Sequence, residues 1–164
     1  MIRKFISLFL FPLFLFKLNG IHSLEFKCNF EEVHSNGTIN QGIVLFKNEK
    51  LRYEYNASNL FIIFINKDKQ FFFDKKNQVL KPIKHNLQLI NSIMDLAKLY
   101  PDIPLEISQK GMEIKVELSE NNNFIKRISI DSKRAKLSLY LKDCDLEKPI
   151  NNIFFKEDPI FYFN

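Results

Sequence analysis

Two cysteines, Cys28 and Cys144, are the residues of this chain best suited to covalent chemistry. In an oxidising compartment a cysteine pair can form a disulfide, which here would join the first predicted strand to a strand near the end. A loop of this length would stabilise the fold by about 4 kcal/mol in the chain-entropy model. Cys28 equally fits as a small buried apolar residue, so both interpretations stay open.

Other side chains that could perform catalysis or hold a metal show no supporting pattern. Asp143 and Asp145 flank the second cysteine, but acids separated by one residue on a strand more often mark a solvated edge than a catalytic pair. The chain has neither a Gly-x-Ser-x-Gly elbow nor a glycine-rich phosphate loop. Zinc-ligand spacing with the cysteines is missing for His22, His34 and His85. We therefore expect no enzyme, no metal and no cofactor.

Residues 1–23 have the pattern of a secretory signal peptide. A basic start is followed by an apolar run over residues 5–16, which is too short and too early for a comfortable membrane span. The small residues Gly20 and Ser23 suggest cleavage near position 20 or 23. Lys17 weakens the cleavage region, so a retained signal anchor stays an alternative. We predict export.

The excess of positive charge belongs largely to this first segment. The formal net charge is +5, and residues 1–23 contribute three cations, Arg3, Lys4 and Lys17, and no acid. Residues 24–164 therefore carry about +2, with Lys and Arg dispersed among Asp and Glu. Such dispersal is typical of a solvated strand face and argues against nucleic-acid binding. We predict one domain over residues 24–164, and a monomer.

Residues 39–83 have the pattern of consecutive antiparallel strands. Any functional side chain in this region must lie on one of these strands. Leu51, Tyr53 and Tyr55 alternate with two charged residues, which puts three large apolar side chains on one face. The run that follows, residues 60–65, is apolar on both faces and leads through a turn into three consecutive phenylalanines. Both faces of that hairpin are apolar, so both must be buried against other parts of the protein.

The remaining segments add further strands and one helix. Residues 24–30 alternate in the same way and then meet Asn36-Gly37, the signal of a type I′ hairpin turn. Residues 86–100 repeat apolar side chains at spacings of three and four, so we expect a helix capped by Asn86 and ended by Pro101.

More alternating strands follow the helix, at residues 112–118, 128–131 and 137–141. Many strands with one or two helices predict a mainly β fold of the α+β type. The expected architecture is a strongly curved antiparallel sheet that forms an incomplete β-barrel with a helix in its concave face.

The order of these elements resembles the LolA-like outer-membrane lipoprotein carriers of Gram-negative bacteria, over about residues 26–159. The family pattern falls, in chain order, on Gly42, Leu51-Arg52-Tyr53-Glu54-Tyr55, Asn66-Lys67, Asp74 and Gln78-Val79. The chain departs from the pattern in having Asn48 where proline is usual, Asn66-Lys67 in place of Asp-Gly, and no tryptophan. It also runs from the signal directly into a strand, without the family's N-terminal lid helix.

The resemblance implies a periplasmic carrier that shuttles lipoproteins from the inner to the outer membrane. Loading would come from an inner-membrane ABC transporter of the LolCDE type, and delivery would go to a LolB-type acceptor. Each acyl CH₂ exposed to water costs about 0.8 kcal/mol, so such cargo needs a dry apolar cavity. Cys28 does not follow a lipobox, which argues against the anchored acceptor LolB itself.

The expected acyl-chain cavity is lined by inward-facing apolar side chains, for which ordinary core packing is the alternative interpretation. These residues are Leu45, Leu51, Tyr53, Tyr55, Ile62, Phe64, Phe71, Phe73, Ile90, Ile93, Met94, Ile114, Val116, Ile128, Ile130 and Leu139. The family holds its lid with a basic residue near the end of the strand at Gly42, and the nearest match here is Lys47.

Two other functions remain open at the level of sequence. One is a non-shuttling lipid or lipopeptide sensor on the same half-barrel, as in the MucB/RseB proteins, although those carry a second domain. A retained N-terminal anchor would favour such a fixed role. The other is a structural β-domain with a simply packed interior.

Overall fold

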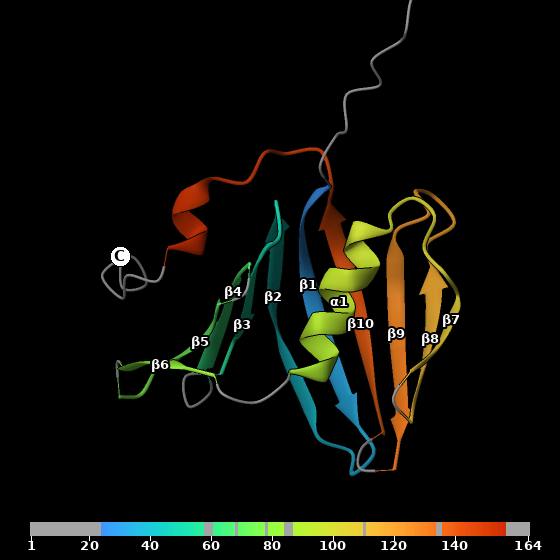
Figure 1. The fold of residues 1–164 in the computed structure, drawn as a ribbon, viewed down its shortest axis with the longest axis horizontal. Coiled ribbons are helices and arrows are strands. Elements are labelled where there is room, and N and C mark those ends of the chain that lie inside the picture. Colours follow the sequence, from blue (N-terminus) through green and yellow to red (C-terminus); the bar gives the residue numbers. More distant parts are fainter. Residues whose placement is uncertain are drawn as a thin grey trace, which may run out of the picture.

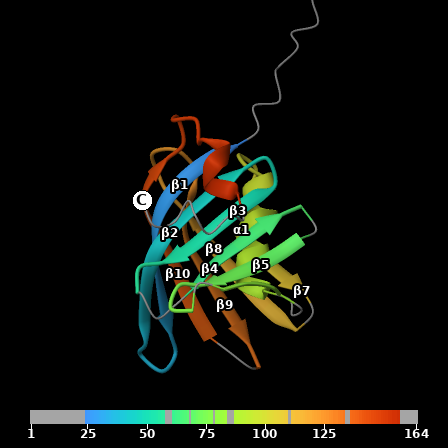
Figure 2. The same ribbon diagram turned by 90° about the vertical axis from the view of Figure 1, so that its left-hand side faces the viewer.

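The computed structural model describes residues 24–57, 61–67, 69–77, 79–83, 87–109, 111–133 and 136–156. These residues form one antiparallel sheet of ten strands in the order β6-β5-β4-β3-β2-β1-β10-β9-β8-β7 (Figures 1 and 2). The strands are β1 (Glu25–His34), β2 (Ile39–Lys47), β3 (Lys50–Tyr55), β4 (Phe61–Asn66), β5 (Lys69–Asp74), β6 (Val79–Pro82), β7 (Glu106–Gln109), β8 (Met112–Leu118), β9 (Ile125–Ser132) and β10 (Lys136–Asp145). The predicted signal peptide lies outside the described residues.

The first and last strands meet in the middle of the sheet, where β1 pairs with both β2 and β10. The two edge strands, β6 and β7, do not pair with each other within the described part of the chain, so the sheet stays open. Between them the described residues form one α-helix, α1 (Gln88–Lys98), which lies across the concave face of the sheet (Figure 1). The predicted curved, open sheet with a helix in its concave face is confirmed.

The helix begins and ends close to the expected positions. Its N-cap is Leu87, which has no side-chain capping bond, and the expected cap Asn86 lies outside the described residues. The last turn ends before Pro101 because the residue before a proline is disfavoured in the helical region. The inward stripe of α1 is fully or nearly buried, and it consists of Ile90, Ile93, Met94, Leu96 and Ala97. In the described part of the chain, no helix is long and apolar enough to span a bilayer.

The first hairpin forms where the sequence predicts it, but with a different turn. A type I′ turn requires positive φ at both central residues, whereas of this pair only Gly37 has it, at 83°. The Asn36 side chain instead accepts a hydrogen bond from the backbone N–H of Thr38 at 3.0 Å. The loop is therefore an Asx-type turn followed by one left-handed glycine.

Gly42 permits a close approach of its neighbours on β1 and β3. A Cβ atom at this position would lie 1.9 Å from the Glu54 carbonyl oxygen and 2.6 Å from the Phe30 ring. The Phe30 ring, directly opposite Gly42 on β1, fills the space that a side chain would take. The glycine of the sequence pattern is thus required by packing.

A second apolar layer covers part of the outer face. After β10 the chain crosses to a short 3₁₀ helix, η1 (Asn152–Phe155), at the outer side of β3 (Figure 2). Ile150 and Phe155 are buried there against Leu45 of β2. The sheet is therefore covered by α1 on its concave face and by the C-terminal segment on part of its outer face.

Candidate functional site

The space between α1 and the concave face is the main apolar interior of the described structure. Residues from β1, β2, β3, β4, α1, β8, β9 and β10 pack there in one cluster. Eleven of the predicted cavity residues belong to it, none more than 9% exposed: Leu51, Tyr53, Tyr55, Ile90, Ile93, Met94, Ile114, Val116, Ile128, Ile130 and Leu139. Binding of an acyl chain by these side chains stays a prediction.

Five predicted cavity residues lie on the other face of the sheet. They are Leu45, which packs under the C-terminal segment, and Ile62, Phe64, Phe71 and Phe73, which form a separate cluster. In the strand register Phe64 stands opposite Arg52 and Ile62 opposite Glu54, so both share the outward face of those charges.

The placement of these five residues in the cavity was wrong for a physical reason. Residues 61–65 are apolar at every position, so alternation gives no phase and the pairing with β3 decides which side chains turn inward. The inward residues of β4 are instead Ile63 and Ile65. On β2 the inward residues are Val44 and Phe46, which leaves Leu45 outside.

The lid contact of Lys47 stays a prediction, and within the described residues Lys47 binds the C-terminal segment. Its Nζ donates to the carbonyl oxygen of Ile150 at 2.7 Å and lies 3.1 Å from Glu25 Oε1. The other oxygen of Glu25 accepts from the backbone N–H of Ile150 at 2.9 Å. Lys47 follows the inward Phe46 and therefore points outward, where it fastens the C-terminal segment.

Arg52 helps to hold the same segment. Its guanidinium donates to Glu54 Oε2 at 3.0 Å through Nε and to the Phe154 carbonyl at 3.3 Å through Nη1. It also stacks 5.7 Å above the centre of the Phe64 ring. The alternation of β3 predicts this outward direction for Arg52, away from the interior.

A buried carboxylate, Glu32, is the polar feature of the interior that the sequence did not reveal. It is 3% exposed, and its Oε1 accepts hydrogen bonds from the hydroxyls of Tyr53 at 2.8 Å and Tyr55 at 3.1 Å. Its Oε2 lies 3.5 Å from Asn40 Nδ2 and 3.4 Å from His34 Nε2. These five residues, from β1, β2 and β3, are called the Glu32 cluster below.

The Glu32 cluster also controls the ionisation of its two tyrosines. Burial is the main cause that raises the pKa of both the Tyr53 and Tyr55 hydroxyls well above their usual range, and the negative charge of Glu32 adds to it. Both hydroxyls therefore stay protonated and can keep donating to the carboxylate. The Phe30 ring stacks on Tyr53, with 4.0 Å between ring centres, and fixes it in place.

Glu32 continues the inward series of the first strand. The inward residues Phe26, Cys28 and Phe30 follow a period of two, and the next inward position is Glu32. The strand expected from the sequence ends at Phe30, because an acidic residue usually ends an apolar face. An acid that continues an inward series is thus a recognisable signal.

The structure joins Cys28 and Cys144 in a disulfide within the same interior. It links β1 to the end of β10, next to an irregularity in their pairing where Asp143 has positive φ. Disulfides of this kind are typical of proteins that fold in an oxidising compartment.

The two acids beside Cys144 have separate structural roles. Asp143 accepts from Asn29 at 3.1 Å. Asp145 accepts from the backbone N–H of Glu147 at 3.2 Å and forms an ion pair with Lys148 at 2.9 Å. The Lys148 hydrogen bond is the main cause that lowers the pKa of Asp145. Each acid is thus held by its own partners.

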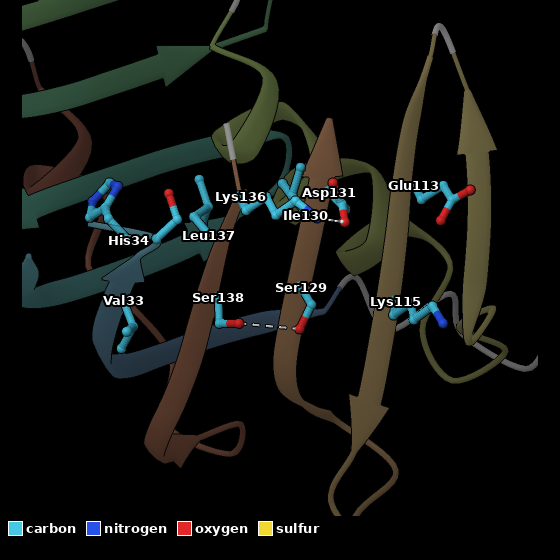
Figure 3. A pocket seen from close by; sticks show the side chains of 11 residues that line it. Val33, His34, Glu113, Lys115, Ser129, Ile130, Asp131, Lys136, Leu137 and Ser138 are labelled. Carbon is cyan, nitrogen blue, oxygen red and sulfur yellow. Dashed lines mark hydrogen bonds and ion pairs between the residues drawn. The ribbon is translucent and has the colours of Figure 1, made fainter. Parts of the chain in front are cut away.

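A hollow of about 440 Å³ lies on the outer face of β8, β9, β10 and β1 (Figure 3). The Ser129 and Ser138 hydroxyls, 3.3 Å apart, stand at its centre, and Lys136 pairs with Asp131 at 2.6 Å. Its other charged side chains include Glu113 and Lys115, one on each side of the inward Ile114. Among the described residues, no group of three or more His, Cys, Asp or Glu side chains is arranged to hold a metal ion.

No family model matches this sequence, and no curated protein matches it. Among solved structures, the fold is similar to the crystal structure of the LolA superfamily protein NE2245 from Nitrosomonas europaea. That similarity covers 82% of this chain and 90% of that chain, with 11% sequence identity and a TM-score of 0.43. Similarity at this level carries no information about function.

Proposed function

We propose that this protein is a periplasmic carrier that binds the acyl chains of lipoproteins between α1 and the concave face of the sheet. The single observation that carries the proposal is an open, curved sheet whose concave face is covered by one helix through apolar contacts. Such a helix can move aside and expose a dry surface long enough for acyl chains.

The contacts of α1 are of the kind that an acyl chain can replace. Ile93 and Leu96 are at most 1% exposed and pack against the sheet without direction-specific bonds. Burying a side chain of this size stabilises by about 1.5–3 kcal/mol, and each acyl CH₂ by about 0.8 kcal/mol. A few CH₂ groups therefore offset the loss of one helical side chain.

The polar contacts between α1 and the sheet are weak where they are described. They include a hydrogen bond of 3.3 Å from Gln70 to Asn91 and an ion pair of 3.8 Å between Lys98 and Glu49, whose side chains are both largely exposed. Exposed pairs of this kind contribute about 0–1 kcal/mol. Displacing the helix thus costs mainly apolar burial, which the cargo restores.

The location of this activity follows from two features of the chain. The signal pattern of residues 1–23 predicts export, and the Cys28–Cys144 disulfide fits an oxidising compartment. In that setting a LolCDE-type transporter would load the carrier, and a LolB-type acceptor would receive the cargo.

Hydrogen exchange of the disulfide-bonded protein tests the proposal. The probe is a diacylated lipopeptide with an acetylated N-terminus, and the control is the same peptide without acyl chains. We expect the diacylated probe to change amide protection in α1 and to leave η1, which packs on the outer face, unchanged. No binding of the diacylated probe, or equal binding of both peptides, would contradict the proposal.

A further inference from the structure

We propose that the Glu32 cluster is a subsite for a primary ammonium group carried next to the acyl chains of the ligand. This inference rests on the proposed function and adds the chemistry of the ligand's polar end. Its starting point is a carboxylate buried inside an otherwise apolar space, with its charge left uncompensated by any lysine or arginine among the described residues.

The partners of Glu32 are neutral donors and one imidazole. Two tyrosine hydroxyls and the Asn40 amide supply hydrogen bonds but no formal charge. The His34 side chain is 35% exposed, and its Nε2 lies 3.4 Å from Glu32 Oε2 and 3.2 Å from Asn40 Nδ2. An imidazole carries a positive charge only when it is protonated. A buried carboxylate held in this way has satisfied hydrogen bonds and still attracts a cation strongly, because the surrounding medium is apolar.

The cluster occupies one end of the interior, and the other end is apolar. Along β1, Glu32 lies six residues from Phe26, which corresponds to about 20 Å of extended strand. The Phe26 ring packs against the rings of Phe46 and Phe124 at 5.4 Å and 4.9 Å. A ligand with one polar end and long apolar chains therefore has one favourable orientation: its polar group near Glu32 and its chains toward Phe26.

The negative charge of the Glu32 cluster determines which polar group of a ligand can bind there. A phosphate or carboxylate would meet the negative charge of Glu32 at close range in an apolar medium, which is strongly unfavourable. A primary ammonium group supplies three donors and the missing positive charge, and a charge-assisted bond is roughly twice as strong as a neutral one. The hydroxyls of Tyr53 and Tyr55 can rotate to accommodate it while they stay protonated.

Such an ammonium group can come from two sources. One is the free N-terminal amine of a lipid-bearing peptide, and the other is the ethanolamine head group of a phospholipid. Three probes with matched acyl chains separate them: a diacylated lipopeptide with a free amine, its N-acetylated form, and phosphatidylethanolamine. A preference for the free lipopeptide over the other two assigns the amine to lipoproteins, and a preference for phosphatidylethanolamine assigns it to the membrane lipid.

The substitution Glu32→Gln keeps the shape of the side chain and removes its charge. Glu31→Gln is the matched control, because Glu31 is the adjacent carboxylate on the opposite face, bonded to Gln41 and Lys142. We expect wild-type protein and the control to bind an amine-bearing probe about tenfold more tightly than the N-acetylated lipopeptide. The Glu32→Gln variant should bind these two probes about equally.

The possible results separate the inference from the proposed function. Binding of the N-acetylated lipopeptide without any preference for an amine would overturn the inference and leave the carrier function standing. An unchanged preference in Glu32→Gln would also overturn it. Failure of every acylated probe to bind would refute the carrier function itself. If Glu32→Gln does not fold, the ranking of the three probes by wild-type protein decides the matter.

Discussion

Substitution of Gly42 by alanine tests the packing that holds the interior together. An added Cβ would lie 1.9 Å from the Glu54 carbonyl oxygen, whereas real contacts of this kind stay beyond 3.0 Å, so β2 and β3 must separate by about 1.1 Å. The Phe30 ring, 2.6 Å from the same Cβ, must also move, and it is the ring that stacks on Tyr53.

The expected loss of stability for Gly42→Ala is about 3 kcal/mol. Overpacking of a core usually costs 1–3 kcal/mol, and here the obstacle includes a backbone carbonyl that cannot rotate away. Alanine restores less than about 1 kcal/mol by restricting the unfolded chain. For a domain of this size the melting temperature should fall by roughly 10 °C.

Urea unfolding of the disulfide-bonded protein measures this loss. The control is Gly111→Ala, where a Cβ meets nothing within 4 Å but φ is 75°, so the expected cost is only about 1 kcal/mol. The near-ultraviolet circular dichroism of the tyrosines should change for Gly42→Ala and stay unchanged for the control. A loss for Gly42→Ala no greater than that of Gly111→Ala would refute the close-approach argument.

Three further predictions follow from the described contacts. Replacing Cys28 and Cys144 together by serine should lower the free energy of unfolding by about 4–5 kcal/mol, since the bond closes a loop of 116 residues. Urea titration measures this loss, and a loss below about 1 kcal/mol would contradict the prediction. Stability should decrease above about pH 10, because the unfolded chain releases the protons of Tyr53 and Tyr55 there while the folded protein retains them. The expected slope is about 1.4 kcal/mol per pH unit for each tyrosine, and Tyr→Phe variants that keep the full slope would contradict it. Lys47→Ala should increase hydrogen exchange in η1 and leave binding of the acylated probe unchanged; reduced binding would contradict this and favour the lid role of Lys47.

The strands could be predicted because their alternation is strong. The series Leu51, Tyr53 and Tyr55 fixed one inward face, and the structure places all three in the interior. Alternation failed on β4, where every position from 61 to 65 is apolar and only the pairing with β3 sets the phase. In a strand that is apolar on both faces, the sequence does not show which side chains point inward, since both faces of the sheet are covered.

The contacts of the C-terminal segment could not be predicted for a different reason. Lys47 and Arg52 bind backbone carbonyls of residues about a hundred positions away. Because every residue has a backbone carbonyl, the sequence does not show which one a side chain will bind. The Glu32 cluster also depends on pairing, because β2 and β3 bring Asn40, Tyr53 and Tyr55 to the inward position of β1. These contacts depend on how strands pair across the sheet. The apolar pattern of a single strand does not show that pairing.

Native mass spectrometry of the protein isolated from the periplasm of its own cells tests the carrier function most directly. The account predicts a complex with one acylated lipoprotein, and a denatured mass that corresponds to a chain starting near Ile21 or Leu24. A free protein with an intact N-terminus and no acylated partner would contradict it.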